Sequence, residues 1–430
     1  MTRSLWHAQL PPRAIALEPP TAADLLVVGG GLSGAWLALA LAEAGRPPVV
    51  LERVHMAAGA SGRNGGLLLP GTAELYPALV ARHGRSAARA LWEWAVAGAA
   101  DMVRTIDRYG IDCDWRPEGA LHAADSAAEA ASLAAAAAML AEDGFPGAWL
   151  APEALDAWLD VDRPVDVHGA LHLPDGGAFH SGRFVAGLAA AATARGAAFV
   201  EGIDVRAVTA PEEGSPLVVH TDRGPIGAEA VVVATNAWLA ELLPAFARSV
   251  VPVRGQVLAT APLPARVIRG AWSLNDGYEY LQQLTDGRLV LGGLRWTAPD
   301  REVGQQAPDV APAIQAGLDA WLARRFPSLA VAVEHRWAGP MCWTADRLPL
   351  VGPVPAGYRG HGDAHVGALS EAAPTSPRLW VAAAYSGHGV PVAPAAARLV
   401  AAALTGGTAA PAAEWVSPSR PLRVAVSARI

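Results

Sequence analysis

Residues 24–45 read DLLVVGGGLSGAWLALALAEAG, a buried strand, a glycine-rich turn and a helix in direct succession. The apolar run at 24–28 contains branched side chains and is bounded by glycine, which is typical of a buried strand. The helical stretch that follows ends at Gly45. A second apolar run, PPVVLE at 47–52, predicts a β–α–β unit with parallel strands and a right-handed crossover.

The glycines of this turn occupy the positions of a dinucleotide-binding fingerprint. Gly29 permits a tight turn, Gly31 lets the backbone approach a pyrophosphate, and Gly34 lets the helix pack against the strand. The helix N-terminus directs free N–H groups and a positive dipole at the phosphates. Glu52 ends the second strand, where a carboxylate can hold ribose hydroxyls, which disfavours NADP. The alternative interpretation is a glycine-rich turn in an ordinary β–α–β unit.

NAD and FAD share this fingerprint, and the next segment separates them. An NAD domain continues with β–α alternation after Glu52, whereas this chain enters ASGRNGGLLLPG at 60–71. Glycine allows a backbone to approach a ligand closely. The pattern therefore favours a ligand that extends beyond the first unit to a second loop, as a flavin does.

Composition excludes several other classes of protein. The 430 residues are 52% hydrophobic with a formal charge of −7, which fits two or three domains with a large core and no nucleic-acid surface. We expect no signal peptide and no membrane span. Two distant cysteines favour a reducing compartment, so a cytoplasmic protein is expected. The chain has no lysine, which excludes P-loop, pyridoxal-phosphate and Ser–Lys chemistry. No metal site is expected, because His361 and His365 lie in a predicted surface loop without further ligands.

Seven short segments, in one order, resemble the FAD-dependent amine and amino-acid oxidoreductases of the D-amino-acid oxidase superfamily. The nearest branch is that of gamma-glutamylputrescine oxidase, with glycine oxidase and sarcosine oxidase more distant. The segments are SLW (4–6), VVGGGLSG (27–34), GASGRNGG (59–66), VVVATNAW (231–238), RGQVLAT (254–260), TADRLPLVG (344–352) and YSGHGV (385–390).

The resemblance and the sequence pattern together predict an α/β fold in which an α+β domain interrupts a Rossmann-like FAD-binding domain. The second domain is expected to carry a large mixed or antiparallel sheet and to bind the substrate. The predicted FAD-binding segments are 1–75, 165–245 and 335–430. The predicted substrate-binding segments are 76–164 and 246–334.

The fingerprint and the resemblance together imply the residues of the site. Arg63 is expected to stabilise negative charge on reduced flavin, and His388 to line the pyrimidine end of the ring; these two are the candidate catalytic residues. Tyr280, Arg295 and Trp343 are the candidate substrate contacts. The expected cofactor contacts are Gly29, Gly31, Leu32, Ser33, Gly34, Glu52, Arg53, Ser61, Gly62, Arg63, Asn64, Gly65, Gly66, Leu67, Val205, Thr235, Asn236, Gly387, His388, Gly389 and Val390.

Non-covalent FAD is expected. Sarcosine oxidase-like enzymes link the flavin to a cysteine shortly before a TPD-like segment. Aligning TAD at 344–346 with that segment puts Gly339 at the position of the cysteine, and Cys342 falls three residues later.

The expected reaction is hydride transfer from the carbon next to an amine nitrogen to flavin N5. The imine would then hydrolyse to an aldehyde or keto acid. Electrons would pass to oxygen, giving hydrogen peroxide, or to another acceptor; the lysine that some relatives hold over the flavin is missing here. An Arg295 that faces the ring would favour an acidic amine or amino acid, and otherwise a plain amine is expected. An NAD-dependent dehydrogenase and a non-catalytic FAD-binding subunit remain as alternatives.

Overall fold

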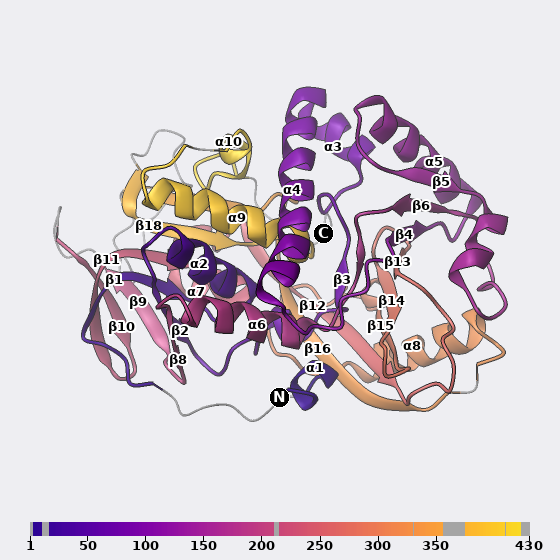
Figure 1. Cartoon of the computed structure of the whole chain (residues 1–430), viewed down its shortest axis with the longest axis horizontal. Coiled ribbons are helices and arrows are strands. Elements are labelled where there is room, and N and C mark those ends of the chain that lie inside the picture. Colours follow the sequence, from indigo (N-terminus) through magenta and orange to yellow (C-terminus); the bar gives the residue numbers. More distant parts are fainter. Residues whose placement is uncertain are drawn as a thin grey trace.

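Two large sheets, each with its own helices, form the computed structural model (Figure 1). It describes residues 3–10, 17–209, 215–329, 331–355, 375–408 and 410–422. None of the helices in these ranges combines the length and the apolarity that crossing a bilayer requires.

The first sheet is built around the β–α–β unit. Its strands follow the order β17–β18–β11–β1–β2–β8, and β10 and β9 extend it from β11. As predicted, β1 pairs in parallel with β2, and it also pairs in parallel with β11. The strands are β1 (Ala22–Val28), β2 (Val49–Glu52), β8 (Ala198–Glu201), β9 (Val205–Thr209), β10 (Leu217–Thr221), β11 (Gly224–Val233), β17 (Leu350–Pro355) and β18 (Thr375–Ala383).

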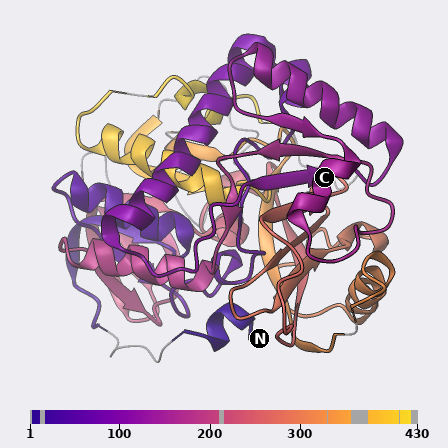
Figure 2. The ribbon, with the colours of Figure 1, turned by 45° about the vertical axis from the view of Figure 1, so that its right-hand side comes forward.

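Strand β1 is apolar on both faces because both faces of the sheet are covered. Leu25 and Val27 pack into one hydrophobic cluster, whereas Leu26 and Val28 pack into another on the opposite face. The first cluster includes helices from the start, middle and end of the chain, and α4 lies across them (Figure 2). These helices are α2 (Leu32–Glu43), α4 (Arg85–Tyr109), α6 (Ser181–Thr193) and α9 (Gly389–Leu404).

The second sheet has the order β16–β12–β15–β14–β13–β4–β6–β5. Its neighbouring strands are antiparallel except for β13 and β4, which are parallel. A separate pair joins β3 (Leu67–Leu68) to β7 (Gly177–Ala178). The strands of the second sheet are β4 (Ala120–Ala123), β5 (Ala148–Leu150), β6 (Ala170–Leu173), β12 (Val250–Thr260), β13 (Ala271–Leu274), β14 (Glu279–Gln283), β15 (Leu289–Gly293) and β16 (Val333–Thr344).

The remaining helices lie around these sheets. The α-helices are α1 (Leu5–Ala8), α3 (Tyr76–His83), α5 (Ala127–Glu142), α7 (Leu239–Leu242), α8 (Pro312–Arg325) and α10 (Ala413–Val416). The 3-10 helices are η1 (Ala60–Gly62), η2 (Pro152–Trp158), η3 (Asn236–Trp238), η4 (Pro244–Phe246) and η5 (Arg295–Thr297).

The predicted fold class agrees with this architecture, but two strands lie in an unexpected sheet. β6 and most of β16 fall in the segments 165–245 and 335–430, which were predicted to bind FAD, yet both strands belong to the second sheet. The reason is pairing: β6 pairs with β4, and β16 pairs with β12 along the whole length of both strands. Alternation of apolar residues predicts a strand without revealing its partner. The division into two functional domains stays a prediction.

Candidate active site

Both sheets contribute to one cavity of about 380 Å³. From the first sheet come the turn after β1, the end of β2, the end of β11 and the start of α9. From the second sheet come β4, β13, β14 and β16. The segment 59–67, called the glycine loop below, supplies a further wall.

The fingerprint turn has the backbone geometry that the sequence predicts. Gly29 has a φ of +112°, and a Cβ there would lie 2.7 Å from the carbonyl oxygen of Ala234. A Cβ at Gly31 would lie 3.0 Å from Ser61 Oγ. Because Leu32 N–H donates to Ser61 Oγ at 2.7 Å, the glycine loop is tied to the N-terminus of α2. Only side-chain-free residues allow this close approach.

Glu52 lies at the end of β2, beside the fingerprint turn. Its two carboxylate oxygens accept hydrogen bonds from Gly30 N–H at 2.7 Å and Val54 N–H at 2.9 Å. Burial raises the pKa of Glu52, although both backbone donors oppose that shift. Arg53 follows, with its guanidinium 5.1 Å from the centre of the Trp238 ring. Glu52, Arg53 and Trp238 all line the cavity.

The short helix α1 holds the glycine loop from one side. Ser4 Oγ donates to the carbonyl of Gly62 at 2.6 Å, and Trp6 Nε1 donates to the carbonyl of Asn64 at 2.7 Å. Within the loop, Asn64 Oδ1 accepts from Gly66 N–H at 2.8 Å. The N-terminal SLW segment therefore supports the loop rather than lining the cavity.

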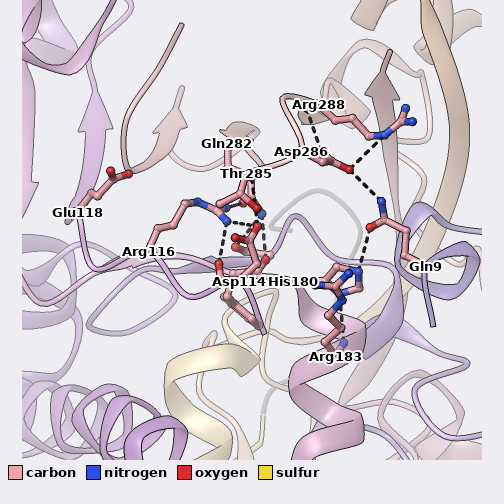
Figure 3. Close-up of polar contacts among 12 residues, drawn as sticks. Gln9, Asp114, Arg116, Glu118, His180, Arg183, Gln282, Thr285, Asp286 and Arg288 are labelled. Atoms are coloured by element: carbon pink, nitrogen blue, oxygen red, sulfur yellow. Dashed lines mark hydrogen bonds and ion pairs between the residues drawn. The ribbon is translucent and has the colours of Figure 1, made fainter. Parts of the chain in front are cut away.

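The second sheet holds the same loop from the other side through Gln282, which is fully buried. The amide of Gln282 donates to the carbonyls of Gly65 and Gly66. Its Oε1 accepts from Arg116, which also pairs with Asp114 (Figure 3). Buried carbonyls that lose such a donor carry a desolvation cost of about 1–3 kcal/mol each.

Arg63 lies at the centre of the glycine loop with only 4% of its surface exposed. Its Nε donates to the carbonyl of Ala58 at 2.8 Å, and its Nη1 donates to the carbonyl of Ala338 at 3.1 Å. Burial lowers the pKa of Arg63, and the charge of Asp309 opposes that shift. A Cβ at Gly339 would lie 2.7 Å from Arg63 Cβ, so β16 approaches the loop closely.

The end of β11 and the start of α9 close the cavity on the side of the first sheet. Thr235 Oγ1 is buried without a hydrogen-bond partner among the described residues. Asn236 Oδ1 accepts from Ala384 N–H at 3.1 Å and so links the ends of two strands. His388 precedes α9, and its Nε2 lies 2.9 Å from the carbonyl oxygen of Leu69. Burial lowers the pKa of His388 to about 4, so its ring is neutral at pH 7.

The three predicted substrate contacts lie together on the wall formed by the second sheet. The Tyr280 ring packs against the glycine loop, since a Cβ at Gly65 would lie 2.6 Å from Tyr280 Cδ2. Trp343 lies between two arginines: the guanidinium of Arg295 is 5.2 Å from its ring centre, and that of Arg347 is 5.4 Å away. The arrangement is typical of cation–π contact.

Most of the predicted residues line the cavity, and three glycines do not. A Cβ at Gly34 would overlap the carbonyl oxygen of Gly29, so α2 approaches the turn after β1 closely at this position. Gly62 and Gly66 are instead packed against protein atoms, of His7 and Gln282 respectively. The predicted residues on the cavity wall are Gly29, Gly31, Leu32, Ser33, Glu52, Arg53, Ser61, Arg63, Asn64, Gly65, Leu67, Val205, Thr235, Asn236, Gly387, His388, Gly389, Val390, Tyr280, Arg295 and Trp343.

Sequence reasoning missed His122, Ser273 and Arg347 on the cavity wall. Arg347 stands in the TADRLPLVG segment, which could have identified it, but no local pattern marks the other two. His361 and His365 lie outside the described residues. Within the described part of the chain, no group of three or more His, Cys, Asp or Glu side chains is arranged to hold a metal ion.

Solved structures share the fold across almost the whole chain. Glycine oxidase from Geobacillus kaustophilus matches with a TM-score of 0.75 and 24% identity, covering 94% of this chain and 100% of that one. L-proline dehydrogenase from P. horikoshii matches with a TM-score of 0.74 and 21% identity, covering 94% and 98%.

Sequence similarity identifies the family. Gamma-glutamylputrescine oxidoreductase of Escherichia coli (strain K12) is 32% identical over 355 residues, 79% of this chain and 80% of that protein. Glycine oxidase of Geobacillus kaustophilus is 28% identical over 347 residues, 77% and 84% of the two chains. Residues 24–403 match the DAO family, described as FAD dependent oxidoreductase, so the predicted enzyme class is confirmed. The chain belongs to the DAO family of FAD-dependent oxidoreductases.

Proposed function

We propose that the protein binds FAD non-covalently and oxidises the CH–NH bond of an amine that also carries a carboxylate. Two relatives are named for gamma-glutamylputrescine and for glycine. The single observation that supports a carboxylate on the substrate is the environment of Arg295.

Arg295 is a buried cation that has no anionic partner in the described part of the chain. Only 6% of its surface is exposed, and among the described residues it forms no ion pair. Its Nη1 donates to the carbonyl of Arg301 at 3.3 Å, and burial lowers its pKa. Arg347 differs, because Glu74 and Asp276 each have a carboxylate oxygen 3.8 Å from it. A buried unpaired charge is costly, so a carboxylate on the substrate would stabilise Arg295.

The residues present fit FAD. Thr235 Oγ1 is buried at the cavity wall and has no hydrogen-bond partner within the described ranges, and the turn at Gly29 and Gly31 leaves little room for a Cβ. The turn and the N-terminus of α2 would hold the pyrophosphate, and Glu52 would hold the ribose. When bound, FAD accepts a hydride from the carbon next to the amine nitrogen.

The chain's own residues would orient the substrate and balance charge. Arg63 places a positive charge within the glycine loop, whereas the neutral ring of His388 adds no charge. Cys342 is buried, and burial raises its pKa to about 12, which disfavours the thiolate that a covalent link needs. Acid precipitation should therefore release all yellow colour into the supernatant; colour left in the pellet would contradict non-covalent binding.

The electron acceptor is proposed to be oxygen, giving hydrogen peroxide, with another acceptor as the alternative. The chain has no lysine, so Arg63 is the candidate for the positive charge that favours reaction with oxygen. Mixing the reduced protein with oxygen and measuring hydrogen peroxide separates the two cases, since slow reoxidation without peroxide would indicate a dehydrogenase.

Anaerobic reduction of the bound flavin tests the proposed function. The matched probes are 4-aminobutanoate and butylamine, which differ by the carboxylate, together with glycine and N-methylglycine. Wild type should be reduced by carboxylate-bearing amines at lower concentrations than by butylamine. A bound flavin that no amine reduces would instead support the non-catalytic subunit.

Substitution of Arg295 tests the carboxylate contact. In Arg295→Met, the dissociation constant of the best carboxylate-bearing amine should rise by about tenfold or more, because a charge-assisted hydrogen bond is lost. Butylamine should be unaffected, and Arg295→Lys should restore part of the affinity. Arg324→Met removes an exposed arginine and serves as the control. Equal losses for butylamine and the acidic amine would contradict the assignment.

A further inference from the structure

Three polar side chains form a row across the second sheet. In the parallel pair of β4 and β13, His122 lies opposite Ser273; in the antiparallel pair of β13 and β14, Ser273 lies opposite Tyr280. Residues paired directly across strands project from the same face of a sheet. All three line the cavity, and His122, Ser273 and Tyr280 are called the polar row below.

The polar row has hydrogen-bonding capacity that the described residues do not use. Ser273 is 1% exposed, and its Oγ has no hydrogen-bond partner among them. No hydrogen bond links a ring nitrogen of His122 or the hydroxyl of Tyr280 to any other described residue. Leaving a buried polar group unpaired costs free energy, so Ser273 Oγ points to a ligand with a complementary atom. The half-buried His122 and Tyr280 add polar atoms beside it on the cavity wall.

One end of the row meets the glycine loop and the other end meets His388. Tyr280 is held between Gly65 and Gly292, at each of which a Cβ would overlap or closely approach its ring. At the other end, the pKa of His122 is lowered to about 4, mainly by burial and to a smaller extent by the nearby His388. Both histidines are therefore neutral at pH 7 and can accept hydrogen bonds.

The chemistry of the row fits a neutral amine. A free amine donates through N–H, and a serine oxygen and a neutral imidazole nitrogen both accept. An ammonium ion would be disfavoured beside Ser273 and a neutral His122, because neither supplies a negative charge that offsets its desolvation. The carbon next to a free amine is also the one from which hydride is lost.

We propose that Ser273 Oγ and a ring nitrogen of His122 accept the N–H bonds of the substrate amine, and so bind it as the free base. This inference rests on the proposed function, in which the same cavity oxidises an amine. Tyr280 would separate this amine site from the Arg295 side of the cavity, so the two ends of the substrate would be recognised by different elements.

The test compares two ligands in anaerobic titrations. The first ligand is the panel compound that reduces wild type at the lowest concentration, and the second is its N,N-dimethyl derivative, whose free base has no N–H. Ser273→Ala and His122→Leu should each raise the dissociation constant of the first ligand by about tenfold. They should change that of the dimethyl derivative by less than twofold. His122→Asn keeps an acceptor and should recover most of the affinity.

Matched controls use neighbouring positions. His172 on β6 pairs with Leu121 on β4, so it projects from the face of the sheet away from His122. His172→Asn should therefore leave the dissociation constants of both ligands unchanged. Ser132→Ala changes an exposed serine on α5 and should do the same. FAD content and the visible spectrum of every variant should match wild type.

Three outcomes would overturn the inference. Variants that lose FAD or shift its spectrum, yet bind the amine as tightly as wild type, would show that the polar row contacts the cofactor instead. An equal rise in the dissociation constants of both ligands would indicate a structural role for the substituted residue. Wild-type flavin that no amine reduces would instead defeat the proposed function itself, and this failure is visible before any variant is made.

Discussion

Arg63 has a structural role, and we propose an electrostatic role for the same side chain. Its hydrogen bonds to the carbonyls of Ala58 and Ala338 join the glycine loop to β16. Its guanidinium remains charged although burial lowers its pKa, because an arginine pKa starts so far above neutrality. A fixed positive charge at this position favours an anionic reduced flavin.

Arg63→Met should lower the midpoint potential of the bound flavin by roughly 30 mV or more, because 30 mV corresponds to about 1.4 kcal/mol for two electrons. Equilibration with a reference dye during reduction measures this potential. Arg63→Lys keeps the charge and should stay closer to wild type. An unchanged or higher potential in a fully FAD-loaded Arg63→Met protein would contradict the electrostatic role.

At the scale of elements, α1 is small but makes specific contacts. It is four residues long, and its Ser4 N-cap and Trp6 donate to carbonyls of the glycine loop. The Trp6 ring also meets His180 and Trp337 edge-on, at centroid distances of 4.8 and 6.2 Å. The helix therefore stabilises the shape of the loop through both hydrogen bonds and packing.

Trp6→Phe should weaken FAD binding by about fivefold while the fold is retained, because one hydrogen bond of about 1 kcal/mol is lost and the aromatic packing remains. Titration of FAD into deflavinated protein measures the effect. Trp158→Phe alters a tryptophan that packs on His172 and lies off the cavity wall, and it should bind FAD as wild type does. Equal affinities for all three proteins would show that α1 does not support the loop.

For the whole molecule, acid should reduce stability before ordinary carboxylates titrate. Burial is the main cause that lowers the pKa of His122, His180 and His388 to about 4. In the unfolded chain these histidines have a pKa of about 6.5. Between about pH 4 and about pH 6.5 the unfolded chain therefore binds more protons than the folded chain. The free energy of unfolding should therefore fall as the pH drops from about 6.5 towards 4.

Urea unfolding at several pH values measures this decrease. His180→Gln should flatten the pH dependence even though its loss of the contact to Gln9 lowers stability overall. His168→Gln, at an exposed position, should keep the wild-type pH dependence. Stability that stays constant or rises from pH 6.5 to 5 would contradict the assignment of these three rings as buried and neutral.

The sequence allowed the β–α–β unit of the first sheet and its glycine turn to be predicted, because their signals are local. Gly29, Gly31 and Glu52 lie within one β–α–β unit, where spacing alone predicts their geometry. The polar row could not be predicted, since His122 and Ser273 meet only through the register of two distant strands. The sheet to which β6 and β16 belong could not be predicted for the same reason.

The glycine loop also imposes an order on biosynthesis. The loop is made early, yet its supports stand far away: Trp6 is 58 residues before Asn64, Gln282 is 217 residues after Gly65, and Trp337 is 274 residues after Arg63. A ribosome therefore exposes the loop long before β14 and β16 emerge. Flavin loading becomes a late event, and a nascent chain stalled before residue 337 would leave the pocket unfinished and its apolar walls open to chaperones.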